Sequence, residues 1–438
     1  MIPEEVLNMK RKPAPILTPK FGPLQGLRVL STTSVIAAPF TASLFAWFGA
    51  EVIHVENPGA GDTMRTMPPR ITRDDKIVSA PWANEATNRL SMELDLRLDK
   101  KPASREVFYG LIKQSDFWLE NLVWLEQRYG ITDREVIEVN PKIIIVHVSG
   151  YGRPEFGGER EKCFRASYDM IGQCYSGWPN LIGPKDAPPS RANPWTGDYC
   201  AAMTAFYGAL MAYLQMLKDG RGQVVDVSQF EALARNFCES YFCTYLNTGM
   251  TVSRSGNKAT GFQPYDIFKA NDGWVAVGTF GQGVYGKFIR CWAPQVGLDP
   301  DEYSWEETSS SPTAVNSKKG LKLDSMLREW IAARSGKEVE YFFNAHEVPC
   351  TRVYTPEMAA SDPHWTDRHN FVEVEDQTLN DKIWVTGVNP KLSRTPGKIW
   401  RGAPSVGHDT EAILKNILGY SDAKINDLRE KKIFSKQL

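Results

Sequence analysis

Short apolar runs alternate with helical stretches along the first half of the chain. Residues 27–32 (LRVLST) and 51–55 (EVIHV) are β-rich runs on either side of residues 38–49, an apolar stretch of small residues that ends in glycine. A strand, a helix and a second strand in this order give a parallel pair with a right-handed crossover. Residues 143–148 (IIIVHV) are nearly all apolar, which is typical of a strand whose sheet is covered on both faces. The pattern predicts an open α/β layer over residues 21–230.

The pattern changes after residue 255. Residues 265–269 and 274–279 flank the turn Ala270-Asn271-Asp272-Gly273, which indicates a β-hairpin. Helical stretches follow, a polar loop is expected at 308–319, and the tail returns to strands before a last helix at 409–418. We therefore expect an N-terminal arm at 1–20, the first part of a large domain at 21–230, a linker helix at 231–254, a smaller α+β domain at 255–365 and a return to the large domain at 366–438.

Residues 199–217 carry no charge over 19 positions, which is close to the length of a membrane span. Asp198 and Lys218 bracket this stretch, and Thr204 and Gln215 interrupt it. A helix that is apolar all round also occurs in the core of soluble proteins. We expect a buried core helix and no membrane span.

Composition narrows the classes of function. The formal net charge is −1, so no global basic field favours nucleic acid. Seven cysteines without a C-x-x-C pair indicate a reducing compartment, and the N-terminal residues lack the apolar core of a signal peptide, so we expect a cytoplasmic protein. The six histidines form no H-x-x-x-H or H-E-x-x-H pattern, so we expect no metal.

The turn after the first predicted strand reads Thr33-Ser34-Val35-Ile36-Ala37. It lacks G-x-G-x-x-G, which disfavours NAD binding. The chain also lacks a phosphate-binding G-x-x-x-x-G-K-[ST] loop and the G-x-S-x-G elbow of serine hydrolases.

Asp198, in Trp195-Thr196-Gly197-Asp198-Tyr199, directly precedes the long apolar stretch. It suits a helix N-cap, because aspartate is a favoured cap and its charge complements a helix N-terminus. It also suits a carboxylate nucleophile that the helix N-terminus keeps ionised. The two interpretations are compatible, and composition does not choose between them.

Two arginines also have alternative interpretations. Arg89 suits a solvated charge at a strand edge. Arg65 follows Gly59-Ala60-Gly61-Asp62, and glycine-rich loops beside arginine can cradle phosphate. Gly281-Gln282-Gly283 suits either a plain turn or a mobile flap.

Several blocks, in order, resemble the family III CoA-transferases, which include formyl-CoA:oxalate and crotonobetaine/carnitine CoA-transferases. The blocks are residues 21–65, 88–96 (NRLSMELDL), 140–152 (NPKIIIVHVSGYG), 197–199 (GDY), 220–228 (GRGQVVDVS) and 396–420. The resemblance covers nearly the whole chain, and the last block is especially similar to the carnitine branch.

The resemblance implies a Rossmann-like large domain and a small domain, with the C-terminus returning to the large one. It implies two interlocked chains, either a homodimer or a hetero-oligomer with a related subunit. The implied reaction moves coenzyme A from an acyl-CoA to a small carboxylic acid through an anhydride and then a thioester on Asp198. Coenzyme A is a substrate, and neither a metal nor NAD is required.

Individual site residues follow from the same resemblance. The Asn-Lys-x-Ser stretch that helps to hold CoA corresponds to residues 88–91, and the arginine near adenosine corresponds to Arg128. Backbone amides around residues 35–38 and 150–152 are candidate oxyanion donors. The expected residues are Asp198 for catalysis; Val35, Ile36, Ala37, Asn57, Arg65, Arg89, Asn121, Leu122, Arg128 and Tyr129 for CoA; and Gly150, Trp195 and Tyr199 for the acid.

The chain departs from the family at three places. The family's Asn-Phe-x-Pro-Gly turn is Asn121-Leu122-Val123-Trp124 here, one residue shorter. Asn57 stands where some members have an arginine that stacks on adenine. The glycine-rich flap of the formyl-CoA enzymes is not evident, and residues 281–283 are a poor substitute.

The sequence is compatible with more than one substrate and with two functions other than CoA transfer. The carnitine branch implies γ-butyrobetaine, carnitine and crotonobetaine, whereas Trp195 and a total of 13 tryptophans also suit an aromatic acid such as benzylsuccinate or an aryl-hydroxy acid. Related racemases have Gly-His-Asp where this chain has Ser167-Tyr168-Asp169, so a racemase is disfavoured. A degenerate subunit that supports an active partner is the non-enzymatic alternative, against which Asp198 argues.

Overall fold

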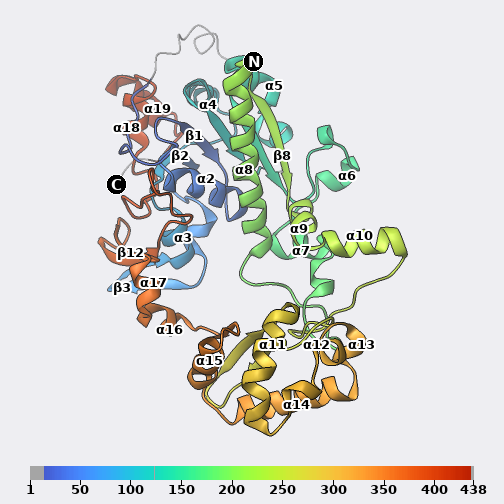
Figure 1. The fold of residues 1–438 in the computed structure, drawn as a ribbon. Helices are drawn as coiled ribbons and strands as arrows, with labels where there is room; N and C mark the ends of the chain where they lie inside the picture. The colour runs from blue at the N-terminus through green and yellow to red at the C-terminus, as the bar shows by residue number, and fades with distance from the viewer. Residues whose placement is uncertain (1–13, 123, 436–438) are drawn as a thin grey trace. The chain divides into compact units, whose positions relative to one another are not determined.

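The computed structural model describes residues 14–122 and 124–435, so most of the expected arm lies outside the described residues (Figure 1). The chain divides into two compact units. The large unit contains the chain up to Trp178, Ala192–Cys243 and the chain from His364 onward, and the small unit contains Pro179–Arg191 and Thr244–Pro363. Whether the domains begin and end where the sequence pattern places them stays a prediction.

The large unit is built on a parallel sheet. Within the described residues its six strands run in the order β5-β2-β1-β6-β7-β8, and every neighbouring pair is parallel. The strands are β1 (Arg28–Thr32), β2 (Glu51–Glu56), β5 (Leu90–Glu93), β6 (Phe117–Glu120), β7 (Ile144–Ser149) and β8 (Gln223–Ser228). From β1 the chain moves outward to β2 and later to the other side at β6. Such a reversal of strand order opens a crevice beyond the carboxyl ends of the two central strands.

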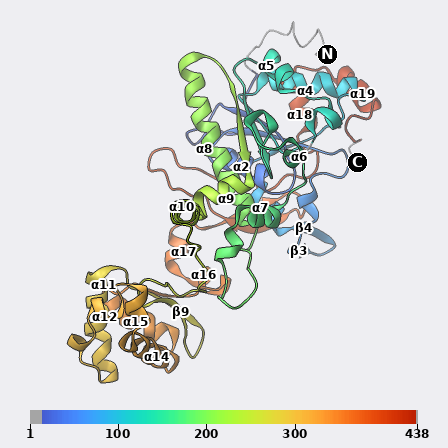
Figure 2. The same cartoon turned by 90° about the vertical axis from the view of Figure 1, so that its right-hand side faces the viewer.

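Helices cover both faces of this sheet (Figures 1 and 2). Neighbouring residues of β1 point to opposite layers: Leu30 joins one buried cluster and Val29 the other. On the first layer lie α4 (Pro102–Gln114), α5 (Asp133–Val139), α18 (Thr410–Asn416) and α19 (Asp422–Glu430). On the second lie α2 (Ala37–Trp47) and α8 (Thr196–Asp219). The predicted α/β layer, with the C-terminus returning to it, is confirmed.

Helix α8 packs through small residues on one side only. Ala201, Ala205 and Ala209 are fully buried against α2 and the sheet, so the helix approaches both closely. The expectation of a helix buried all round is wrong, because α8 exposes a stripe of large apolar side chains: Met203, Tyr207, Met211, Leu214 and Leu217. By length and hydropathy α8 is also the one helix among the described residues that meets the criteria for a membrane span, which is weak evidence by itself.

The small unit has its own antiparallel sheet and core. The predicted hairpin is confirmed as β9 (Tyr265–Lys269) and β10 (Trp274–Gly278), and β11 (Cys350–Arg352) pairs with β10. Aromatic residues from α11 (Gly281–Trp292), α14 (Lys318–Ala332) and α15 (Gly336–Ala345) fill the core. The stretch expected to be a loop contains the short helix α13 (Pro312–Val315), because Ser311 caps its N-terminus and Pro312 suits the first turn.

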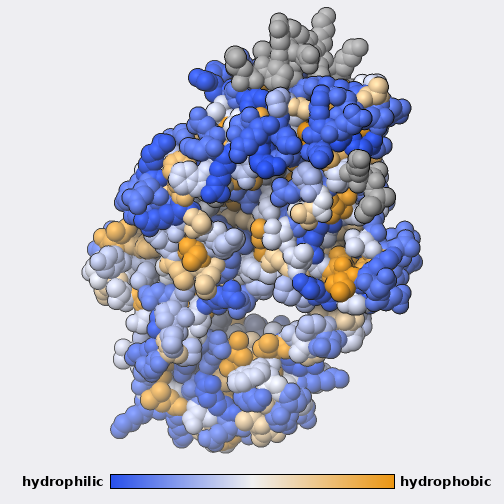
Figure 3. Space-filling model, turned by 180° about the vertical axis from the view of Figure 1, so that it is seen from behind, coloured by the Kyte–Doolittle hydropathy of each residue, from blue (hydrophilic) through white to orange (hydrophobic). Residues whose placement is uncertain are grey.

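Two other segments differ from expectation. The linker expected as one helix is two helices, α9 (Gln229–Phe237) and α10 (Glu239–Thr248), separated at Cys238. In the tail, the two expected strands are confirmed as the hairpin β12 (Phe371–Asp376) and β13 (Asp381–Thr386), whereas the sequence pattern did not predict α19, which buries few residues. The face of the molecule in Figure 3 is mostly hydrophilic with separate hydrophobic patches, which is usual for a protein surface.

The small-residue face of α8 leads to a stability prediction. Ala209→Leu inserts three carbons where Ala209 is fully buried between α8 and its neighbours. We expect the free energy of unfolding to fall by about 1–3 kcal/mol, measured by urea denaturation. Ala332→Leu at the exposed end of α14 is the matched control and should change stability by less than about 0.5 kcal/mol. Equal effects of the two variants would show that the α8 interface is loosely packed.

Candidate active site

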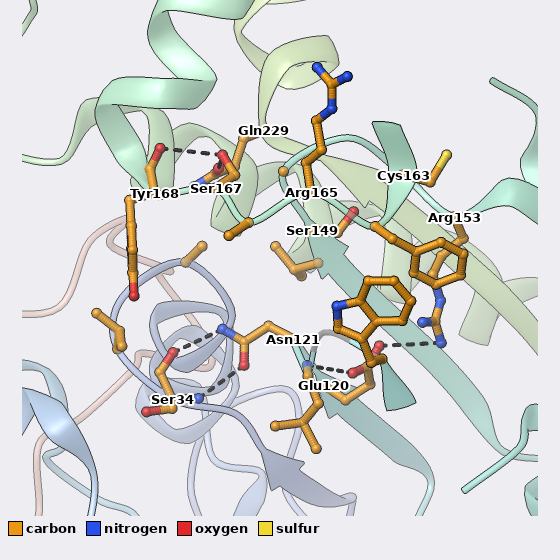
Figure 4. Close-up of a pocket in the computed structure, with 18 of the residues that line it drawn as sticks. Ser34, Glu120, Asn121, Ser149, Arg153, Cys163, Arg165, Ser167, Tyr168 and Gln229 are labelled. Carbon is orange, nitrogen blue, oxygen red and sulfur yellow. Dashed lines mark hydrogen bonds and ion pairs between the residues drawn. The ribbon is translucent and has the colours of Figure 1, made fainter. Parts of the chain in front are cut away.

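A cavity of about 300 Å³ opens beyond the carboxyl ends of the central strands (Figure 4). Its walls come from residues 34–37 after β1, residues 120–122 at the end of β6 and in its following loop, and residues 148–150 of β7 and its following loop. Residues 163–168, Asp198 and Gln229 also line it, as do Trp124, Arg128, Tyr129, Arg153 and Pro154. The cavity lies where the strand order of the sheet reverses, and we call it the switch-point cavity.

Two of these loops are joined by a pair of amide hydrogen bonds, visible in Figure 4. The Ser34 amide donates to Asn121 Oδ1 at 3.0 Å, and Asn121 Nδ2 donates to the Ser34 carbonyl at 2.8 Å. The Val35 amide donates to Asp62 Oδ1 at 3.2 Å, with Val35 in the left-handed region at φ 70°. The Val35 amide already donates to Asp62, so it is not available to an oxyanion. Of the backbone amides expected as oxyanion donors at residues 35–38, only those that follow Val35 are left as candidates.

Asp198 lies in the first turn of α8 and is 7% exposed. Its side chain does not cap the helix, so the N-cap interpretation is wrong. Asp169, from α7 (Asp169–Ser176), satisfies the end of the helix instead: its Oδ1 accepts from the amides of Gly197 at 2.7 Å and Asp198 at 3.3 Å. Asp198 Oδ1 accepts a hydrogen bond from Gln229 Nε2. The capping role of Asp169 therefore leaves the Asp198 carboxylate directed to the cavity lining.

The electrostatics of Asp198 differ from the sequence expectation. Burial and the nearby Asp169 carboxylate raise the pKa of Asp198 to about 7, although the Gln229 hydrogen bond acts in the opposite direction. The expectation that the helix N-terminus keeps this group firmly ionised is wrong, because desolvation and a like charge outweigh it. Asp198 is therefore divided between its two protonation states near neutral pH.

A second cavity, of about 520 Å³, lies beside the first in the large unit. Arg128 and Tyr129 line both cavities. Lys101 and Lys432 add positive charge to the second cavity, whereas Arg97 there is paired with Asp95. We call it the basic cavity. A site with this excess of cations suits the phosphates of a nucleotide.

The structure brings most of the expected residues together. Those that line the switch-point cavity are Asp198, Val35, Ile36, Ala37, Asn121, Leu122, Arg128, Tyr129 and Gly150, and Asn57 lines the basic cavity. Sequence reasoning missed Gln229, Ser167, Lys101 and Lys432. No motif marks Gln229, Lys101 or Lys432, because these three approach the site from separate segments, Lys432 from beyond α19. Ser167 lies in the stretch that matches the racemase Gly-His-Asp motif, which did not mark it as a site residue of a transferase.

Four expected residues line neither cavity. Arg65 is held in an ion pair by Glu56 at 2.7 Å and stacks on Trp82. Arg89 is fully buried, and its Nη2 donates to the Pro39 carbonyl at 2.6 Å, so it is not a solvated strand-edge charge. Trp195 and Tyr199 instead pack against a buried apolar cluster that includes Ile36 and Trp82.

A buried charge network supports the loop after β6. His147 of β7 bonds to Glu120 through Nδ1 and to Asp133 through Nε2 at 2.8 Å. Glu120 in turn accepts from the Leu122 amide at 2.7 Å, and Arg153 lies 3.7 Å away. Burial opposes a charge on His147, but the two carboxylates outweigh it and raise the pKa of His147 to about 9. Within the described residues no group of three or more His, Cys, Asp or Glu is arranged to hold a metal ion.

This chain is similar to several known proteins. The sequence pattern of CoA-transferase family III matches residues 24–410. The bile acid CoA-transferase BaiK of Clostridium scindens is 33% identical over 95% of this chain and 90% of its own length. The succinyl-CoA–D-citramalate CoA-transferase of Chloroflexus aurantiacus is 30% identical over 94% of this chain and 98% of its own length.

Solved structures share the fold. A CAIB/BAIF family protein from Brucella suis has a TM-score of 0.77 and 22% identity, covering 91% of this chain and 100% of that one. Rv3272 from Mycobacterium tuberculosis has a TM-score of 0.74 and 18% identity, covering 89% and 99%.

The His147 network predicts a pH dependence of stability. Because the pKa of His147 is raised in the folded state, its contribution is present below its ordinary value near 6.5 and is lost as pH rises through about 9. Relative to His147→Gln, the native protein should lose about 3 kcal/mol of unfolding free energy between pH 6.5 and 10. Urea denaturation at stepped pH measures this. His346→Gln, at an exposed imidazole, should keep the native slope. A His147→Gln slope equal to the native one would contradict a charged His147.

Proposed function

The chain belongs to CoA-transferase family III, and on that basis we propose that Asp198 is the covalent carrier through which it moves coenzyme A from an acyl-CoA to a free carboxylic acid. The observation that supports this role most directly is the position of Asp198: its carboxylate lines the switch-point cavity, held there by Gln229. Carboxylates act as nucleophiles when a site positions them against an acyl carbon.

The reaction needs two acyl exchanges at one carboxylate. Ionised Asp198 attacks the carbonyl carbon of the donor acyl-CoA, the C–S bond breaks, and a mixed anhydride and the CoA thiolate form. The thiolate then attacks Asp198 Cγ, releasing the donor acid and leaving an enzyme thioester. An acceptor carboxylate reverses the two steps. One thioester replaces another, so the exchange requires no metal, NAD or ATP.

Both cavities are needed to hold CoA while the acids exchange. The basic cavity suits the nucleotide, with Lys101, Arg128 and Lys432 available to its phosphates. Arg128 and Tyr129 line both cavities, so the pantetheine arm passes them on its way to Asp198. Contacts to the nucleotide, remote from the chemistry, then position the thiol and are maintained while the acyl group changes.

The identity of the carboxylic acid is a separate part of the proposal. A carnitine-type acid has no support from the named relatives, one of which acts on bile acid and the other on D-citramalate with succinyl-CoA. An aromatic acid is the alternative, although Trp195 packs against the buried cluster that includes Ile36 and Trp82 and does not line the cavity. A panel that contains γ-butyrobetaine, benzylsuccinate, a bile acid and D-citramalate, each with succinyl-CoA and acetyl-CoA, identifies the pair. A racemase stays disfavoured, since no histidine is among the described residues that line the switch-point cavity.

The assembly is a further part of the proposal. The exposed stripe on α8 consists of large apolar side chains at positions three or four apart, from Met203 to Leu217. Contiguous apolar surface of this kind marks a protein interface. It supports the homodimer that the family resemblance implies, with a related second subunit as the alternative. Nothing in this proposal calls for nucleic acid or a membrane, and a cytoplasmic location remains our expectation.

The role of Asp198 is tested by trapping. Incubation with acyl-CoA in the absence of acceptor should add CoA to the protein, and borohydride or hydroxylamine should then modify Asp198 alone, as located by peptide mass spectrometry. Asp198→Asn should form no adduct and should lose transfer activity by at least about 10⁴-fold, while still binding CoA. Asp186→Asn, at an exposed loop carboxylate, is the control and should behave as the native protein. Modification of Asp169 in place of Asp198 would move the site.

The basic cavity leads to a separate prediction. Arg128→Ala removes a cation that lines both cavities, so the KM for acyl-CoA should rise about 10- to 100-fold, with a smaller change in kcat. The KM for the acid should stay constant. Arg134→Ala, an exposed arginine of α5, is the matched control. Steady-state kinetics at two salt concentrations measure the effect, and an unchanged KM for acyl-CoA in Arg128→Ala would place the nucleotide elsewhere.

A further inference from the structure

Among the described residues, Gln229 is the one whose side chain donates a hydrogen bond to the Asp198 carboxylate. It is the first residue of α9 and is 6% exposed. Its Nε2 donates to Asp198 Oδ1, and its Oε1 accepts from Ser167 Oγ at 2.9 Å, a contact drawn in Figure 4. An ionised carboxylate only accepts hydrogen bonds, so the amide nitrogen of Gln229 faces Asp198, and the amide oxygen is left to accept from the Ser167 hydroxyl. The orientation of the amide is therefore set by its own partners.

Two glycines make room for this pair of side chains. A Cβ at Gly172 would lie 2.8 Å from Gln229 Cβ and 3.1 Å from its Oε1. A Cβ at Gly150 would lie 2.1 Å from Ser167 Cβ. Gly150, expected from sequence to contact the acid, thus also has a packing role. The tight fit on both sides keeps the amide of Gln229 at one position relative to Asp198.

We propose that Gln229 is a catalytic residue that donates its hydrogen bond to Asp198 Oδ1 throughout the reaction, which reserves Oδ2 as the attacking oxygen. This inference rests on the proposed function. It assigns different tasks to the two oxygens of one carboxylate. The neutral amide keeps its donor at every pH at which the enzyme works.

The tasks follow from the bonds that form and break. Oδ2 attacks the donor carbonyl carbon, and the thiolate leaves. When the thiolate attacks Asp198 Cγ, the C=O pair of electrons moves to Oδ1, which becomes the oxyanion that Gln229 already faces. Collapse of this intermediate breaks the Cγ–Oδ2 bond, and Oδ2 departs with the donor acid. Attack by the acceptor carboxylate on the thioester again places the charge on Oδ1. A donor placed in advance at an oxyanion lowers the barrier without reorganisation.

The experiment measures the rate at which acyl-CoA alone converts the enzyme into its CoA thioester, by intact-protein mass spectrometry. Gln229→Leu should slow this step about 10²–10³-fold with little change in the KM for acyl-CoA, and should move the acid limb of the rate profile to higher pH. Gln25→Leu, at an exposed glutamine, is the matched control and should react at the native rate.

Two further variants separate a catalytic donor from a structural role. Gln229→Glu has nearly the same shape but donates only when protonated, so its rate should fall with rising pH over a range in which the native rate rises. Gly172→Ala displaces Gln229 and should slow the native enzyme, yet add no further loss in the Gln229→Leu background.

The outcomes distinguish the inference from the proposed function. Thioester formation at the native rate in folded Gln229→Leu, or an unchanged pH profile in Gln229→Glu, would overturn the role of Gln229 and leave Asp198 as carrier. Failure of the native enzyme to form any thioester at Asp198 would overturn both.

Discussion

The burial of the Asp198 carboxylate beside a second carboxylate is the constraint on which the rest of the site depends. Water is largely excluded from Asp198, and Asp169 repels its charge, so the ionised form is held at a cost that raises its pKa to about 7. A shift of this size corresponds to roughly 4 kcal/mol. Acylation converts the carboxylate into a neutral anhydride or thioester and relieves that cost. The same burial that penalises the resting ion therefore favours the covalent intermediates that the proposed reaction requires.

The fold provides this environment with ordinary elements. The reversal of strand order at β1 and β6 opens the cavity, and the small-residue face of α8 lets the N-terminus of that helix reach it. Asp169 accepts hydrogen bonds from the backbone amides at the N-terminus of α8. The Asp198 carboxylate is therefore not used as a helix cap and can take part in the reaction. Glu120, which is paired with His147, accepts from the Leu122 amide in the loop after β6, and Asn121 joins that loop to the one after β1. Each contact is local, but together they fix one carboxylate against one cavity.

Much of this fold could be predicted from the sequence, since continuous apolar runs such as residues 143–148 allow few alternatives to a covered strand. A role for Asp198 was predictable only through the family resemblance, because an aspartate before an apolar helix suits an N-cap as well as a nucleophile. The electrostatics were not: the capping role of Asp169, 29 positions earlier in the chain, and the burial of Arg89 depend on long-range packing. Gln229 and Lys432 escaped notice for the same reason, since a neutral amide and an isolated lysine have no sequence signature until the fold brings them to the site.

The most direct test of Asp198 as carrier follows single oxygen atoms. The enzyme–CoA thioester is allowed to react once with an acceptor acid labelled with ¹⁸O in both carboxyl oxygens, and the peptide that contains Asp198 is then weighed by mass spectrometry. Because the acceptor oxygen that attacks Cγ stays behind when the new acyl-CoA forms, we expect one ¹⁸O atom in that peptide and none in Asp198→Asn. A peptide that gains no label while the acid becomes its CoA ester would contradict the account.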